Sequence, residues 1–583
     1  MPPQQTPASA LRVTFARVVC SEWVKVRSLR ATGWGLALLA LSYLVLGFIP
    51  AVAAPFSLDQ PAEASRALVV AVATIGIGPA QLVIAVLGVL AIGGEYSSGS
   101  IRASLIAVPS RLPVLFAKVL VLAVVTALTS LAAAAATIAL TAPILIAKGY
   151  QIHPEDDSVV FPVLGGAVYL SLIAVLAIAI GAIVRHTAGA LAVVLTPLLV
   201  LPTLAIGIVS ATKSVALENL VALLPSTAGQ ALYLFQAGSG GVGVHLLPWQ
   251  GLLIVLSWST VGAVLATLAL MKRDTVLSAG HRRRRVGLPA RGLATSRIHH
   301  GVSGTGRLSF ANVVLSEWVK FRSVRSTGWC YATIVVVIAG YGCLRAATVR
   351  PLDVGGSIAE ATDVETMYAI TAGIGLAQLI VAVLGVVIIS GEYTTGSIRS
   401  TLTAVPRRLP VFFGKLVVLA VTTAVVSGIS LAITAAVIVP VHLAGGFEPR
   451  LLDPAVASPI LRGTLYLSMI GILALAIGTI LRSAVGGIAT MVTLLIVLPS
   501  LFNILSRSTN NTDAAWIGNL GRLLPASGDQ FYQFIDSAHH TDFQQFQNGT
   551  LLISPEQGVL IVLAWLVAGL IVAIVALRHR DTT

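Results

Sequence analysis

Twelve long apolar runs without a charged side chain divide this chain of 583 residues. Each is close to 20 residues or longer, which is the length that an α-helix needs to cross a bilayer. Because lipid offers no partners to backbone polar groups, such runs are expected to be helical. The sequence therefore predicts an all-α polytopic membrane protein with twelve transmembrane helices. The runs lie at residues 33–53, 67–92, 119–147, 162–184, 187–210, 251–271, 328–344, 368–390, 416–441, 463–481, 483–505 and 558–577.

The runs fall into two similar halves of six. Residues 94–118 and 391–415 align without a gap and are identical at 17 of 25 positions. Shorter matches at an offset of 295 to 300 include Ser21–Lys25 with Ser316–Lys320, and Arg185 with Arg482. Since six is an even number, both halves enter the membrane in the same direction. We therefore expect two parallel six-helix repeats, related by a pseudo-two-fold axis along the membrane normal.

This duplication sets the predicted domains. Residues 1–271 form a first six-helix unit that begins with an interfacial helix, and residues 308–583 form a second unit of the same kind. Residues 272–307 contain the run His281–Arg285 among Gly, Ser and Pro, and they read as a basic cytoplasmic linker.

The net charge of +14 is distributed in a way that indicates topology rather than nucleic-acid binding. With both termini inside, the inward segments hold 28 of the 37 Lys and Arg residues but only 6 of the 23 acidic residues. Cytoplasmic loops are enriched in Lys and Arg in this manner. We therefore expect a multi-pass protein of the cell membrane with both termini cytoplasmic, in contact with lipid and with no nucleic-acid partner.

A predicted helix precedes the first apolar run of each half. Its apolar residues share one side, which suits a helix lying in the inner membrane interface. Glu22 and Glu317 fall inside this apolar stripe, and Lys25 and Lys320 follow three residues later. A carboxylate there is unfavourable without a partner. We hypothesise that Lys or Arg residues of 94–118 and 391–415 neutralise these two glutamates, each within its own half.

The repeated segment 94–118 contains a second short helix. Gly94 and Gly99 permit a turn, apolar residues then recur with helical spacing, and Pro109 ends the helix. Such an amphipathic helix on the cytoplasmic face suits docking of a cytoplasmic partner. An ordinary interfacial loop would explain the apolar spacing, but it would not explain why the charged residues of this segment recur in the second half.

The chain shows no motif for chemistry of its own. It has no GxxxxGK[ST] phosphate loop, no metal-ligand spacing among its ten histidines and three cysteines, and no nucleophile motif. We expect no enzyme activity, no metal and no cofactor on this chain. The predicted spans also lack the charged relays of ion-coupled transporters. Gln81 and Gln378 lie in mid-span, where they either bond a neighbouring helix or face a central translocation path.

The pre-membrane Glu-Trp-x-Lys, the turn Gly-Glu-Tyr-x-x-Gly-Ser-Ile-Arg, the Arg-x-Pro step and the following Lys resemble the ABC-2 type permease subunits of bacterial ABC exporters. The resemblance covers both halves, whereas such permeases usually carry one six-helix unit per chain. It implies a coupling helix after the second span, and re-entrant outer helices before the sixth. It also implies a separate ATPase that holds ATP and Mg²⁺, with two copies expected per chain. The residues it assigns to coupling are Glu95, Tyr96, Arg102, Arg111, Glu392, Tyr393, Arg399 and Arg408.

The function expected is outward movement of an amphipathic or hydrophobic compound, such as a drug, an antibiotic or a lipid. An ion-coupled secondary transporter with two six-helix halves is the alternative, and a membrane scaffold or sensor that does not transport is a third possibility. Collapse of the proton gradient without ATP depletion would separate the first two.

Overall fold

The computed structural model describes most of the chain, and every regular element in the described part is helical. The predicted all-α fold class is therefore confirmed for this part. The described residues are 14–54, 56, 61–101, 106, 108, 111–185, 187–212, 214–234, 246–272, 309–348, 358–405, 408–444, 446, 454–499, 501–502, 515–528 and 553–579. The predicted linker falls almost entirely outside this part.

The helices of the two halves follow one another in a similar order. Those of the first half are α1 (Phe15–Ser28), α2 (Arg30–Ala53), α3 (Ala62–Thr74), α4 (Ile77–Ser98), α6 (Arg111–Ala147), α7 (Asp157–Val184), α8 (Thr187–Leu195), η2 (Thr196–Val200), α9 (Leu201–Thr212), α10 (Val215–Ala222), α11 (Pro225–Tyr233) and α12 (Pro248–Lys272). Those of the second half are α14 (Phe310–Ser323), α15 (Arg325–Thr348), α16 (Ile358–Thr371), α17 (Ile374–Thr395), α18 (Ser397–Ala404), α19 (Arg408–Ala444), α20 (Pro454–Leu481), α21 (Ala484–Val492), η4 (Thr493–Val497), α23 (Ala515–Arg522), η6 (Pro525–Gly528) and α26 (Pro555–His579).

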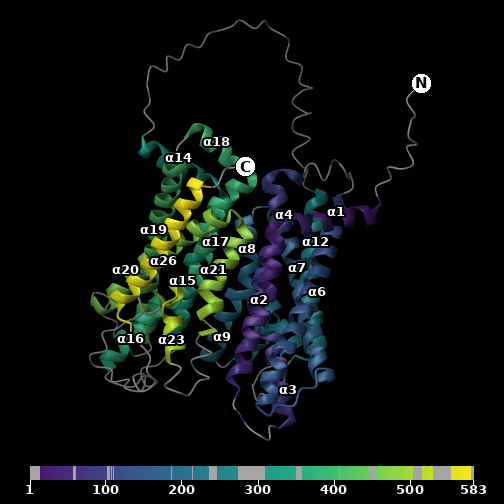
Figure 1. The fold of residues 1–583 in the computed structure, drawn as a ribbon. Helices are drawn as coiled ribbons and strands as arrows, with labels where there is room; N and C mark the ends of the chain where they lie inside the picture. The colour runs from purple at the N-terminus through teal and green to yellow at the C-terminus, as the bar shows by residue number, and fades with distance from the viewer. Residues whose placement is uncertain are drawn as a thin grey trace, which may run out of the picture.

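The long helices run between two ends of the molecule. In Figure 1, α1, α14 and α18 lie at one end, which we call the junction end, and α3, α16 and α23 lie at the other. The two halves stand side by side and meet through equivalent helices. The second-half helix α21 packs on α2 and α4, and the first-half helices α8 and α9 pack on α15. The interface between the halves is therefore built from the same kinds of helix on each side.

Within each half, the second apolar helix packs closely on the fourth. A Cβ added at Gly88 would lie 2.6 Å from the Cβ of Ala177 on α7, and one at Gly385 would lie 2.6 Å from the carbonyl oxygen of Gly471 on α20. Small residues permit this close approach of helix backbones, which supplies much of the packing energy between membrane helices.

The count of membrane-crossing helices differs from the sequence prediction. In the described residues, ten helices are long and apolar enough to cross a membrane, and two shorter apolar helices lie at Gly189–Val200 and Ala484–Val497. These correspond to the fifth predicted span of each half. A π-helical turn interrupts the α-helix there, as η2 or η4. Such turns depend on tertiary packing and have no clear sequence signature.

Several helices extend beyond the charge-free apolar runs and so include charged side chains. The third apolar helix of each half begins at Arg111 or Arg408 and includes Lys118 or Lys415. Helix α15 includes Arg345, one residue past its predicted end, and α16 adds Glu365. Lys118, Lys415, Arg345 and Glu365 each have an ionic partner, as described below, which makes their charge tolerable in apolar surroundings.

Short helices precede the last apolar helix of each half, and α23 of the second half lies at the end opposite the junction end (Figure 1). Helix α11 packs on α7 and α12. The indole Nε1 of Trp258 on α12 donates to the carbonyl oxygen of Leu223 at 2.9 Å, and Trp565 on α26 bonds Leu523 at 2.8 Å in the same way. These bonds hold the outer segment of each half against its last helix. The resemblance implies re-entrant outer helices in this part of each half, and residues 235–245, 506–514 and 529–552 there lie outside the described residues.

Candidate functional site

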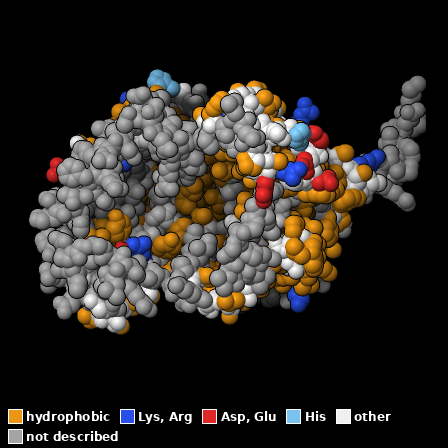
Figure 2. Space-filling model, turned by 90° about the horizontal axis from the view of Figure 1, so that it is seen from below, with side chains coloured by type: hydrophobic (Ala, Val, Ile, Leu, Met, Phe, Trp, Pro, Cys, Tyr) orange, Lys and Arg blue, Asp and Glu red, His pale blue; other side chains and the backbone are white. Residues whose placement is uncertain are grey.

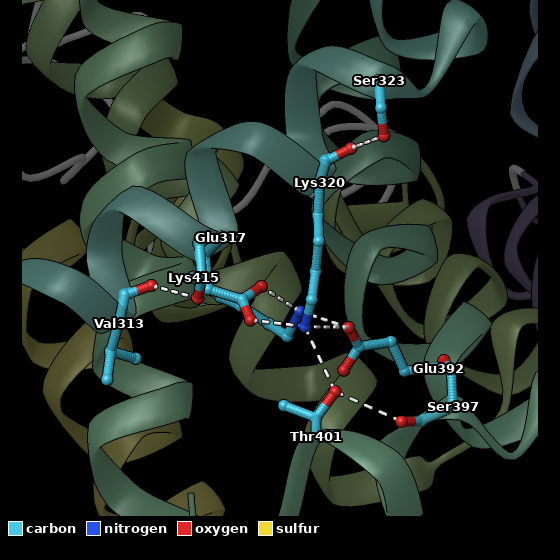
Figure 3. Close-up of polar contacts among 9 residues, drawn as sticks. Val313, Glu317, Lys320, Ser323, Glu392, Ser397, Thr401 and Lys415 are labelled. Carbon is cyan, nitrogen blue, oxygen red and sulfur yellow. Dashed lines mark hydrogen bonds and ion pairs between the residues drawn. The ribbon is translucent and has the colours of Figure 1, made fainter. Parts of the chain in front are cut away.

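A cluster of four charged side chains joins three helices at the junction end of the second half. We call it the second junction; it consists of Glu317 on α14, Lys320 on α14, Glu392 on α17 and Lys415 on α19 (Figure 3). Glu317 bonds Lys320 at 2.7 Å through Oε1 and Lys415 at 2.5 Å through Oε2. The Oε1 atom of Glu392 lies 2.7 Å from the Nζ of Lys415 and 3.4 Å from that of Lys320. The two acids and two bases therefore form a closed ring.

The first half carries the same arrangement, which we call the first junction: Glu22 and Lys25 on α1, Glu95 on α4 and Lys118 on α6. Glu22 bonds Lys25 at 2.5 Å and Lys118 at 2.7 Å. Glu95 bonds Lys25 at 2.9 Å and Lys118 at 3.0 Å. Of the two lysines bonded to each glutamate, one lies on the same helix, and the other, Lys118 or Lys415, belongs to segment 94–118 or 391–415 of the same half, as hypothesised.

The junctions are largely removed from solvent. Only 3% of the Glu22 side chain and 7% of the Lys118 side chain are exposed. A buried charge is tolerated when its partner and hydrogen bonds are present, and removal of one partner strands the other. Each junction therefore ties α1 or α14, the helix predicted to be interfacial, to the long apolar helices.

Lys25 and Lys320 are the more exposed bases of the two clusters. Burial disfavours the charged form of Lys25, but hydrogen bonds and Coulomb attraction from Glu22 and Glu95 outweigh it and raise its pKa above 10.5. Glu317 and Glu392 raise the pKa of Lys320 in the same way, against the same effect of burial. A raised lysine pKa means that the ion pairs persist at neutral pH and weaken only when the pH rises above the ordinary lysine range.

The segment that follows Glu392 turns sharply into the predicted coupling helix, α18. Gly396 ends α17 with a left-handed backbone, φ +70°, and begins α18, and Gly99 ends α4 at φ +73°. Ile398 packs its side chain into the protein, as Ile101 does in the first half. Lys320 also donates to the hydroxyl of Thr401 on α18 at 3.1 Å. The second junction is thus bonded directly to α18.

The predicted coupling residues divide into groups by position. Glu95 and Glu392 are only 13% exposed and point into the junctions. Arg408 donates from Nη1 to the carbonyl oxygen of Leu577, near the end of α26, at 2.9 Å. Arg102 and the side chains of Arg111 and Arg399 lie outside the described part. A direct contact of these residues with a partner stays a prediction.

Tyr96 and Tyr393 each lie next to a junction glutamate and face an arginine. The guanidinium carbon of Arg185 lies 5.3 Å from the centre of the Tyr96 ring, and that of Arg482 lies 5.3 Å from the Tyr393 ring. Arg185 and Arg482 end α7 and α20. Sequence reasoning noticed that these arginines recur but gave them no role, because nothing in the sequence pairs them with a tyrosine 89 residues away.

The second half of the chain matches a known transporter family. Residues 316–582 match the family model described as ABC-2 family transporter protein. These residues make up a little under half of the chain, and we call them the ABC-2 domain after this similarity. The comparison with curated proteins found no match.

The ABC-2 domain and the ten long apolar helices make this chain a multi-pass membrane protein. Proteins of the ABC-2 family are membrane components of transporters, are not themselves catalytic, and normally work with an ABC ATPase. The match therefore supports a permease of an ABC transporter. The second junction and α18 lie within the matched residues.

The predicted path residues Gln81 and Gln378 each bond a tyrosine of their own half. Tyr169 donates to the side-chain oxygen of Gln81 at 2.5 Å, and Tyr466 on α20 donates to that of Gln378 at 2.5 Å. This matches the alternative in which each glutamine bonds a neighbouring helix. Their place on a translocation path stays a prediction.

The ABC-2 domain also holds a polar cluster near the end opposite the junctions, and sequence reasoning missed it. Arg345 on α15 forms two bonds to Glu365 on α16, at 3.1 and 2.8 Å, and its guanidinium lies over the Tyr368 ring. His442 on α19 is 1% exposed and bonds the Thr366 hydroxyl at 3.1 Å. At the corresponding place the first half has an apolar cluster that includes Val69 and Leu145. The two halves are therefore not equivalent at this end.

Proposed function

We propose that this chain is the membrane-spanning permease of an ATP-driven ABC exporter, with the ATP-hydrolysing subunit on a separate chain. The observation that carries the proposal is the junction, which recurs in both halves at the same end of the molecule. Each junction connects an interfacial helix to the apolar helices, and the second is also bonded to α18. In this arrangement, a displacement of α18 by a bound partner would be transmitted through the junction to the membrane helices.

The topology proposed is twelve spans in two parallel repeats, with both termini cytoplasmic. The helices of the two halves follow the same order, which supports this topology. The helices α8 to α9 in the first half and α21 to η4 in the second lie where the fifth predicted span of each half is expected. The excess of Lys and Arg in segments at the junction end supports a cytoplasmic position for that end.

The partner proposed is an ABC ATPase that binds ATP and Mg²⁺, with two copies on each chain. Two junctions on one chain support this stoichiometry. Helix α18 and its counterpart after Gly99 are the proposed docking elements, with Arg102 and Arg399 on their polar sides as the candidate contacts.

The cargo proposed is an amphipathic or hydrophobic compound that moves outward. An apolar recess at the contact between the halves supports this choice. It is lined from α2 by Leu41 and Ser42, from α4 by Val83, and from the second half by Thr493 and Val497. Figure 2 shows apolar side chains in a hollow near the middle of the face opposite the junction end. We retain Gln81 and Gln378 as proposed path residues, although Gln81 faces Tyr169 in this conformation.

An ion-coupled secondary transporter is the second candidate, and the Arg345, Glu365 and His442 cluster favours it. Ionisable groups within membrane helices often serve as proton relays. A ring of bonds between Arg345 and Glu365 also suits a purely structural role, since it holds α15 against α16.

The test is affinity purification of the tagged full chain from its native membrane, followed by reconstitution into liposomes. We expect an ATPase to copurify, and its hydrolysis rate to be unchanged by a protonophore or a sodium ionophore. If the chain instead purifies alone and takes up a hydrophobic dye only when an ion gradient is imposed, the exporter proposal is wrong and the second candidate is favoured.

A further inference from the structure

Two arginines adopt a backbone conformation that is normally left to glycine. Arg185 has φ 61° and Arg482 has φ 51°, and they are the only residues other than glycine with positive φ in the described part of the chain. Each ends a long helix, and its backbone N–H donates to the carbonyl oxygen of Gly181 or Gly478 at an N···O distance of 2.9 Å. Glycine is the usual residue here because a Cβ is strained in this conformation. Glycine would therefore end either helix with less strain.

The side chains give a reason for the strained backbone. Each guanidinium lies 5.3 Å from the ring centre of Tyr96 or Tyr393. These tyrosines lie in the last turn of α4 and α17, next to a junction glutamate, and their carbonyl oxygens accept from the N–H of Gly99 or Gly396 at 3.4 Å. A guanidinium over an aromatic ring is an attractive contact, and it is stronger where water is excluded.

In the first half the same guanidinium reaches a third helix. Nη2 of Arg185 donates to the carbonyl oxygen of Ala269 at 3.3 Å. Ala269 lies in the last turn of α12, where backbone carbonyls lack an intrahelical partner. Arg185 thus joins the ends of α7, α4 and α12. This contact lies where α4 leads into residues 94–118, which we call the coupling segment of the first half; residues 391–415 are that of the second half.

We propose that Arg185 and Arg482 are positioning residues, which hold the turn after the second apolar helix against the fourth apolar helix. A displacement of the coupling segment then moves the turn and the fourth helix together. This deepens the function proposed above and rests on it. If these residues served only to end α7 and α20, the arginine side chain would be dispensable.

The first experiment uses the purified full chain and needs no partner. Arg482→Gly removes the guanidinium and relieves the backbone strain, Arg482→Lys keeps the charge without the planar group, and Arg322→Gln on the exposed side of α14 is the control. We expect Arg482→Gly to melt at the same or a higher temperature than the native chain. Residues 393–404 should nevertheless exchange their amide hydrogens at least about fivefold faster. The exchange rate of these amides in Arg482→Lys should lie between that of the native chain and that of Arg482→Gly.

Two results of this experiment would overturn the proposal. Unchanged exchange at 393–404 in Arg482→Gly would show that the arginine only ends α20. A lower melting temperature, with exchange raised evenly from α17 to α26, would mark it as a general residue of the fold.

The second experiment measures ATP hydrolysis by the ATPase that copurifies with the chain. Arg482→Gly and Tyr393→Leu should each retain the bound ATPase but lower its hydrolysis about fivefold. The double variant should be no worse than either single variant, because both remove the same contact. Native hydrolysis in Arg482→Gly, or additive losses in the double variant, would contradict the proposal. If no ATPase copurifies with the native chain, the proposed function fails, and the exchange experiment still decides the role of Arg482.

Discussion

Glu317 shows how a single residue of this chain acts through its partners. Its carboxylate is buried on an interfacial helix, which is unfavourable by itself, and both of its oxygens bond lysine. The sequence placed Glu317 in an apolar stripe and so predicted that a partner was needed. The contact of Arg482 with Tyr393 was not predictable, because it depends on how the ends of α17 and α20 meet in space.

The junction predicts an asymmetry between single and double substitutions. Lys415→Met should leave the carboxylates of Glu317 and Glu392 with Lys320 as their one shared counter-charge in the junction, and so destabilise the protein by about 3–5 kcal/mol. Adding Glu317→Gln should recover a substantial part of this loss, since a neutral amide needs no counter-charge. Thermal unfolding of the detergent-solubilised chain measures both variants. If the double variant is no more stable than Lys415→Met, the ion pair is not the origin of the effect.

At the scale of elements, the sequence predicted which segments are helical better than where the helices end. The charge-free apolar runs are shorter than the helices. Helix α19 begins at Arg408, whose guanidinium bonds the Leu577 carbonyl, and α15 ends at Thr348, beyond Arg345, which pairs with Glu365. The π-helical turns η2 and η4 were not predicted, because each lies inside a continuous apolar run that suits an ordinary α-helix equally well. The short helix α18 was predicted from its glycine turn and apolar spacing.

The turn into α18 predicts a specific requirement for glycine. Gly396→Ala should cost about 1–2 kcal/mol, because φ +70° is strained for a residue with a Cβ. Gly391→Ala, five residues earlier in α17, is the matched control, since a Cβ there meets nothing within 4 Å. We expect the control to be neutral or stabilising. Equal melting temperatures for the two variants would argue against a left-handed turn at Gly396.

The close packing of α17 on α20 predicts a second requirement for glycine. A Cβ at Gly385 would lie 2.6 Å from a backbone oxygen of α20, so Gly385→Ala should force the helices apart and cost about 1–3 kcal/mol. Gly375→Ala on the same helix meets open space and serves as its control. Unfolding temperatures in detergent measure the difference. A Gly385→Ala variant as stable as Gly375→Ala would contradict the packing described.

At the scale of the whole molecule, the chain carries two similar charged junctions at one end and two dissimilar clusters at the other. The duplication was visible in the sequence because it preserves the junction residues almost unchanged. The polar cluster around Glu365 escaped notice because Arg345 and Glu365 both fell just outside the apolar runs. Two similar junctions suit two copies of the same partner. The polar cluster of the second half and the apolar cluster of the first indicate that the halves differ at the end opposite the junctions.

The central claim is that a separate ATPase drives this chain from two equivalent sites, and native mass spectrometry of the affinity-purified full-length chain tests it most directly. We predict a complex with two ATPase subunits for each copy of the chain. Removing one site by replacing Ser397–Ala404 with a Gly-Ser segment of equal length should leave one subunit. A native chain that carries no ATPase at any protein concentration would contradict the account.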